Sequence, residues 1–199
     1  MTIESMEYSS SLNGAAFLLF ELKQVAKLKL EGFSDKEIRD RVKAENLFQF
    51  ESTGRTKRTL SSIMKRVATL DEKLCELLLT ESNDVARVIN LYAIMKTDRL
   101  FMEFMEDVIS EKLMTNNFLL EKKDLNGFFR SKEEQSEKIA SFSELNVEKL
   151  KRAIMQVLFE AGILTKRQSG EINRIVLDSN LKEHLLSNGE QRYIRAFGE

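Results

Sequence analysis

The sequence predicts a mainly α-helical protein, a two-lobed helical bundle with a small, winged-helix-like β-hairpin near the C-terminus. The 199 residues contain no proline, so no ring interrupts the hydrogen-bond ladder of a helix. Apolar residues recur at helical spacing along most of the chain, and Ser, Asn, Asp and Gly stand where helices would begin and end. A chain of this length can bury a core without disulfides or metals.

The first half of the chain is predicted to be helical throughout. Apolar residues at helical spacing predict a first helix over residues 15–31, and Gly32 is placed to end it. The capping box from Ser34 to Glu37 begins a short second helix. A third helix carries apolar positions between Leu60 and Leu70, after a polar stretch with Gly54. A fourth helix is predicted around residues 74–79, and two longer helices, around 84–96 and 98–114, are predicted to supply the central core.

The second half begins after Asn117, where the helical pattern breaks. Short helices are predicted around residues 125–129 and 133–140, followed by a longer one that starts near Asn146 and ends at Gly162. A polar turn and the β-branched run 172–177 then predict a hairpin, before two last helices over 180–189 and 191–197. We therefore predict two domains: an N-terminal helical domain, 1–117, with a helix-turn-helix-like start, and a C-terminal winged-helix-like domain, 118–199.

The composition argues against several classes of function. Lys and Arg number 31 and Asp and Glu 32, so any attraction for phosphate must be local. A single cysteine and a single histidine predict neither a disulfide framework nor a zinc site. No set of side chains converges on catalysis, and neither a signal peptide nor a membrane anchor is recognised. We expect a soluble, cytoplasmic, non-enzymatic protein with no catalytic residues, metal, cofactor or small-molecule substrate.

Two sets of basic residues are candidates for binding nucleic acid. Between Ser52 and Leu70 there is no acid, and helical rotation places most of the basic residues there opposite the apolar positions. This cationic stripe can neutralise phosphates, or it can be an ordinary solvated helix face. About nine residues separate the predicted second and third helices, against 3–4 in the usual helix-turn-helix. The stripe contains Arg55, Lys57, Arg58, Lys65 and Arg66.

The second set lies in the predicted C-terminal domain. An outward row on its long helix includes Arg and Gln, the side chains suited to reading base edges, and the predicted wing carries cations that could hold backbone phosphates. A winged helix can equally serve protein packing, so the fold does not settle the role. The row is Lys149, Arg152 and Gln156, and the wing cations are Lys166, Arg167 and Arg174.

Several sequence blocks resemble one known family. The run from Ala93 to Phe104 is supported by Glu45-Asn46-Leu47-Phe48, by the pairs Lys57-Arg58 and Lys65-Arg66, and by the block from Leu158 to Leu164. On these blocks the chain is similar to the BrxA family over nearly its whole length. The resemblance implies a small non-enzymatic member of a BREX system, a set of cytoplasmic proteins that methylate host DNA and exclude phage.

The family resemblance leaves three modes of action open. The family is associated with double-stranded DNA, which is the partner we expect, together with other BREX proteins. It has also been likened to the NusB fold, which implies RNA binding as an alternative. A third possibility is a scaffold that bridges BREX proteins without touching nucleic acid.

Overall fold

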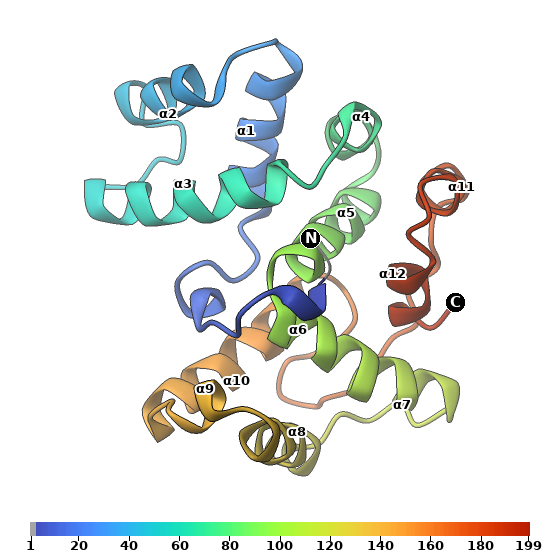
Figure 1. The fold of residues 1–199 in the computed structure, drawn as a ribbon. Coiled ribbons are helices and arrows are strands. Elements are labelled where there is room, and N and C mark those ends of the chain that lie inside the picture. Colours follow the sequence, from blue (N-terminus) through green and yellow to red (C-terminus); the bar gives the residue numbers. More distant parts are fainter. Residues whose placement is uncertain (1–2) are drawn as a thin grey trace.

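The computed structural model describes residues 3–199, and its regular elements there are all helices (Figure 1). An upper lobe contains three helices that pack on one another, and two further helices connect it to the rest of the molecule. A short N-terminal segment runs down from this lobe and contains two single turns. The elements are η1 (Ile3–Ser5), η2 (Ser11–Gly14), α1 (Leu19–Leu30), α2 (Asp35–Ala44), α3 (Thr53–Val67), α4 (Glu72–Thr80) and α5 (Asn83–Thr97).

The lower part of the molecule is built around a rod of three consecutive helical segments, the middle one a π-helix. Three helices lie below and beside this rod in Figure 1, and the last two stand at the right-hand side. The elements are α6 (Arg99–Phe104), η3 (Met105–Ser110), α7 (Glu111–Met114), α8 (Lys122–Gln135), α9 (Glu137–Ala140), α10 (Glu144–Glu160), α11 (Ser179–Ser187) and α12 (Gln191–Ala196). Over residues 3–199, none of the helices has the length and apolar character needed to cross a membrane.

Local sequence signals explain where several helices begin. The capping box of α2 is confirmed, since Ser34 accepts from the Glu37 amide while the Glu37 carboxylate accepts from the Ser34 amide at 2.9 Å. Asp98 caps α6 by accepting from the amide of Phe101 at 3.0 Å. The long helix α10 is capped by Ser143 rather than by the predicted Asn146. The expected helical fold is therefore correct, with shifts of a few residues at the ends.

One hydrophobic core runs through both parts of the molecule. Phe101 and Phe104 of the rod are fully buried at its centre. Across the predicted domain boundary, an ion pair joins Lys112 to Asp124 at 2.8 Å. The division into domains after residue 117 stays a prediction.

The predicted C-terminal hairpin is wrong. The structure of residues 3–199 contains no strand, and only two isolated antiparallel bridges occur, Leu164 with Ile172 and Leu119 with Glu171. The first bridge closes the polar turn as expected, but the pairing stops there, because Gly162 has just ended α10 and little chain remains to form a strand. Residues 3–199 therefore form no winged-helix unit.

The β-branched run after the turn forms one bridge, at Ile172, and does not continue as a strand. Ile172 is buried in the core, whereas Val176 is 85% exposed. The Arg174 guanidinium between them donates to the carbonyl oxygen of Leu113 at 2.8 Å, at the end of α7. Tertiary packing has thus overridden a local β preference.

Candidate nucleic-acid interface

The exposed face of α3 is the strongest candidate for contact with nucleic acid. Its apolar side, with Leu60 and Ile63, is buried against α1, α2 and α5. On the opposite side Gly54, Arg58 and Lys65 lie close to one line along the helix. Since a helix rises about 1.5 Å per residue, Arg58 and Lys65 stand ~10 Å apart along the axis. That span is comparable to the ~12 Å width of the DNA major groove.

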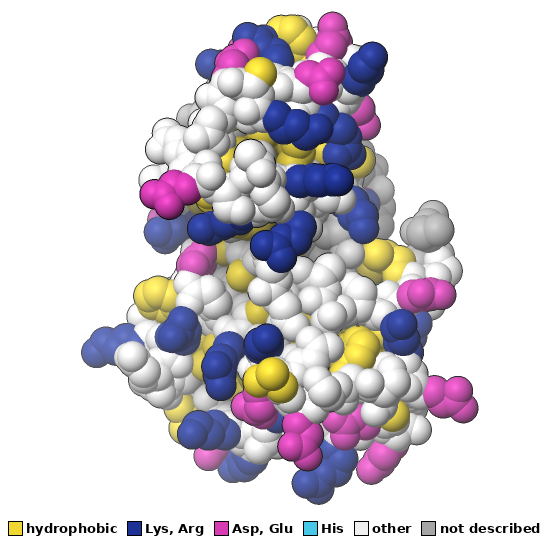
Figure 2. Space-filling model, turned by 90° about the vertical axis from the view of Figure 1, so that its left-hand side faces the viewer, with side chains coloured by type: hydrophobic (Ala, Val, Ile, Leu, Met, Phe, Trp, Pro, Cys, Tyr) yellow, Lys and Arg dark blue, Asp and Glu magenta, His cyan; other side chains and the backbone are white. Residues whose placement is uncertain are grey.

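The cations on this face are not neutralised by the protein. Residues Thr53–Val67 of α3 include no acid. Lys57, Arg58 and Lys65 are exposed, and their side chains make no ion pair or hydrogen bond within residues 3–199. The Arg55 guanidinium stacks 4.0 Å from the ring centre of Phe50 and remains exposed. Figure 2 shows Lys and Arg side chains gathered over the upper half and waist of the face that carries α2 and the start of α3.

Arg66 does not belong to this face, and its predicted outward position is wrong. Its side chain is only 4% exposed, and its guanidinium donates to the carbonyl oxygens of Ala15, Ala16 and Phe17, the last two at 2.8 Å. Burial lowers the pKa of Arg66 to about 10. Arg66 stands at the border between the two faces of α3, where the N-terminal segment covers it. Its role is to hold that segment against α3.

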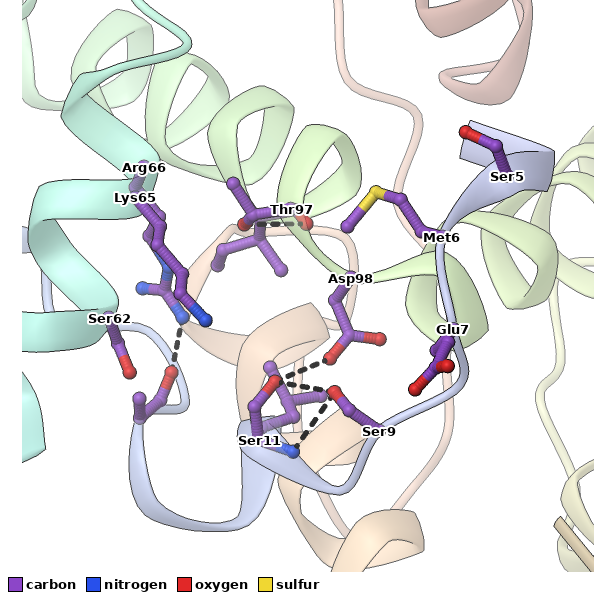
Figure 3. A pocket seen from close by; sticks show the side chains of 13 residues that line it. Ser5, Met6, Glu7, Ser9, Ser11, Ser62, Lys65, Arg66, Thr97 and Asp98 are labelled. Atoms are coloured by element: carbon purple, nitrogen blue, oxygen red, sulfur yellow. Dashed lines mark hydrogen bonds between the residues drawn. The ribbon is translucent and has the colours of Figure 1, made fainter. Parts of the chain in front are cut away.

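A cavity of about 400 Å³ opens beside Lys65 (Figure 3). In Figure 3, Lys65 and Arg66 extend from α3 toward the N-terminal segment, and Asp98 stands on the far side. Asp98 is buried and accepts from the Ser11 hydroxyl at 3.2 Å; burial raises its pKa. Charges of both signs line this cavity, so it does not extend the positive face of α3.

The predicted C-terminal residues do not form one surface. Lys149, Arg152, Lys166 and Arg167 are exposed, but Gln156 hydrogen-bonds both Glu160 and Arg167. Arg174 is used within the protein, since its guanidinium also donates to the Asn116 side chain at 2.9 Å and lies 5.3 Å from the ring centre of Phe118.

The structure brings only part of this set together. Arg152 and Arg167 line one groove, together with Lys122 and Lys151, which the sequence analysis did not single out. Lys122 and Lys151 belong to different helices, α8 and α10, so no local pattern in the sequence connects them.

An acid stands between the two basic regions. Arg55 at the start of α3 and Glu160 at the end of α10 line the same shallow cavity at the waist of the molecule. The positive surface of α3 is therefore interrupted before it reaches the C-terminal groove. We treat the two regions as separate candidate sites.

Comparisons with known proteins point to one family. The family model described as BrxA matches residues 6–189. The chain is 37% identical over 194 residues to the BREX protein BrxA of Bacillus cereus (strain H3081.97), covering 96% of both chains. It is 23% identical over 188 residues to the BREX protein BrxA of Paramagnetospirillum magneticum (strain ATCC 700264 / AMB-1), covering 94% of both. The crystal structure of an uncharacterized protein from Magnetospirillum magneticum shares the fold, with a TM-score of 0.84 at 22% identity over 96% of this chain and 98% of that one.

Proposed function

The chain belongs to the BrxA family, and we propose that it is a non-enzymatic component of a BREX phage-defence system that binds double-stranded DNA through the exposed face of α3. It works in the cytoplasm, without a metal or cofactor, beside other BREX proteins. The two curated relatives carry the name of the BREX system, and this name supports the assignment to phage defence.

The observation that carries DNA binding is the unneutralised charge of α3. The whole chain has a net charge of −1, yet this helix exposes four cations and no acid. Gly54 precedes the cations and Ser61 lies between Arg58 and Lys65 on the same face, and their small size allows a phosphate backbone to approach closely. Lysine and arginine neutralise phosphates, while the serine hydroxyl can donate to a phosphate oxygen.

The shape of the upper lobe favours a DNA duplex over an RNA duplex. An exposed helix fits the wide major groove of B-form DNA, whereas the major groove of A-form RNA is too deep and narrow to admit side chains. The helix also stands third in a unit of three mutually packed helices, as a recognition helix does. Residues 45–52 separate α2 from α3, a longer connection than the usual 3–4 residues.

The C-terminal row contributes to this proposal only as a prediction. Its basis was a wing that would hold phosphate beside a reading helix, and the described residues, 3–199, contain no such wing. Lys149 and Arg152 remain exposed on α10 and can be tested separately.

The test is a variant in which Arg55, Lys57, Arg58 and Lys65 are all changed to Gln. A control variant carries the same charge change on other helices, at Lys73, Lys123, Lys138 and Arg195, which are all exposed. Binding to a fluorescent DNA duplex is measured by anisotropy at several salt concentrations. For wild type we expect a log–log slope of about −4, since four phosphates release their counterions.

The α3 variant should bind more than about 10-fold more weakly at low salt and lose most of that slope, while the control variant keeps both. Equal losses in the two variants would show that only overall charge matters and would overturn the assignment to α3. Tighter binding to structured RNA than to duplex DNA would overturn the preference for DNA. If neither duplex DNA nor structured RNA is bound in a salt-dependent way, the result would favour a scaffold that bridges BREX proteins without touching nucleic acid.

A further inference from the structure

A groove of about 910 Å³ lies between α8, α10 and the turn that follows α10, on a part of the molecule separate from the face of α3. Its walls come from segments far apart in the sequence, which explains why the sequence did not reveal it. The lining includes four apolar and four basic side chains. The apolar side chains are Leu119, Leu120, Leu125 and Met155, and the basic ones are Lys122, Lys151, Arg152 and Arg167.

Part of the apolar lining of the groove is open to solvent. Leu119 is 44% exposed, whereas Leu120 and Leu125 are buried. Met155, on α10, is half-buried. Methionine adapts its shape to different partners, and grouped exposed apolar side chains are typical of surfaces that bind another protein.

The groove carries an excess of positive charge. Its two acids are already paired, Glu148 with Lys151 at 2.7 Å and Glu121 with Lys123 at 2.6 Å. The hydrogen bond from Lys151 lowers the pKa of Glu148, and the nearby charges of Lys122 and Arg152 act in the same direction.

Three cations of the groove therefore remain without an acid. Within residues 3–199, Lys122 and Arg152 pair with no acid, and Arg167 is bound only to the amide of Gln156. An acidic occupant would therefore match the charge of the groove.

The main chain of Leu119 adds hydrogen-bonding groups that the turn does not use. The neighbouring residues pair with the turn, because the Leu120 amide donates to the Gly170 carbonyl at 2.8 Å and the Ile172 amide to the Phe118 carbonyl at 2.9 Å. In this antiparallel pattern the amide and carbonyl of Leu119 point away from the turn. The carbonyl accepts no hydrogen bond within residues 3–199, and the amide makes only a 3.4 Å contact with the Asn117 side chain.

We propose that this groove binds an extended segment of a partner protein in which acidic residues alternate with apolar ones. The apolar side chains would cover Leu119 and Met155, and the carboxylates would pair with Lys122 and Arg152. The main chain of the segment would bond to Leu119, as in strand addition to a sheet edge.

Single-stranded nucleic acid is a poorer occupant of the groove. Among the described residues that line it, none is aromatic, so the groove offers no ring on which a base could stack. This inference does not depend on DNA binding by α3.

The experiment selects peptides from a random phage-displayed library on the full-length protein and then measures synthetic copies of the selected peptides by fluorescence polarisation. The discriminating variants are Arg152→Glu, which changes the groove, and Lys149→Glu, which lies on the same helix but does not line the groove. Both residues are exposed, so both variants should fold, and circular dichroism checks this. A third variant, Leu119→Asp, removes the apolar contact.

We expect selected peptides rich in Asp or Glu together with Leu, Ile or Phe. Their affinity should fall at least 10-fold with Arg152→Glu and with Leu119→Asp, and stay within twofold with Lys149→Glu. Selection of no peptide, selection of peptides without acids, or equal effects of the two α10 variants would each overturn the proposal. A parallel loss of duplex DNA binding in both α10 variants, with peptide binding unchanged, would assign the row to DNA instead.

Discussion

Replacing Arg66 by Met tests whether this residue holds the fold together or contacts DNA. The methionine fills similar space but donates no hydrogen bond, so three main-chain carbonyls lose a donor. The carbonyl of Phe17 keeps a second donor, the Asn90 amide at 2.6 Å, and Ala16 is only half-buried, so water can reach it. Ala15 is 4% exposed, and its carbonyl would be left unsatisfied.

The magnitude follows from these three carbonyls. The Ala15 carbonyl, buried without a partner, costs about 1–3 kcal/mol of stability. The carbonyls of Ala16 and Phe17 each lose one hydrogen bond but keep water or Asn90 as a partner, so their loss destabilises the fold less. Removing a buried charge that has no ion pair offsets part of this cost. For Arg66→Met we therefore expect the free energy of unfolding to fall by about 2–4 kcal/mol. Lys65→Met, at an exposed position with no partner, should change it by less than ~0.5 kcal/mol.

Urea unfolding followed by circular dichroism gives the free energies, and DNA anisotropy gives the salt slopes of the same two variants. Lys65→Met should reduce the slope by about one, and Arg66→Met should leave it unchanged where the protein is folded. The reasoning is refuted if Arg66→Met unfolds at the wild-type urea concentration while its DNA slope falls. That result would show that Arg66 contacts DNA and does not stabilise the fold.

Two further variants test other parts of the fold. Burial alone would raise the pKa of the Glu103 carboxyl, but hydrogen bonds, first of all from Lys132 at 2.7 Å, hold it below its usual value. The ionised carboxylate therefore stabilises the fold above about pH 4.5, and this contribution is lost as the pH falls through the lowered pKa. Lys132→Met should start acid unfolding at a higher pH in a circular-dichroism titration, and an unchanged midpoint would contradict this. Gly170→Ala should lower Tm more than Gly189→Ala. Both positions have positive φ, but only at position 170 would the alanine Cβ lie 2.0 Å from the carbonyl oxygen of Leu120. Equal shifts in Tm would show that the turn moves to make room for the methyl group.

Short-range signals in the sequence were sufficient for the helices and for most of the α3 site. A cap such as Ser34 depends on a residue three positions away, and the apolar stripe of α3 depends on neighbours three or four positions apart. Because these interactions lie within one turn of helix, any fold that contains the helix keeps them. The sequence by itself therefore determined the helical class, the family resemblance and the outward position of Arg58 and Lys65.

The tertiary structure decided everything that depends on distant segments. Arg66 is buried because residues 15–17 cross over the border of α3, about 50 positions earlier in the chain. Residues 3–199 form no wing, because α10 ends directly before the turn and the Arg174 guanidinium ties the run after the turn to the end of α7. The groove exists because α8 and α10 bring Lys122 and Arg152 together. Helical periodicity reports which face a residue occupies, whereas only packing determines what covers that face.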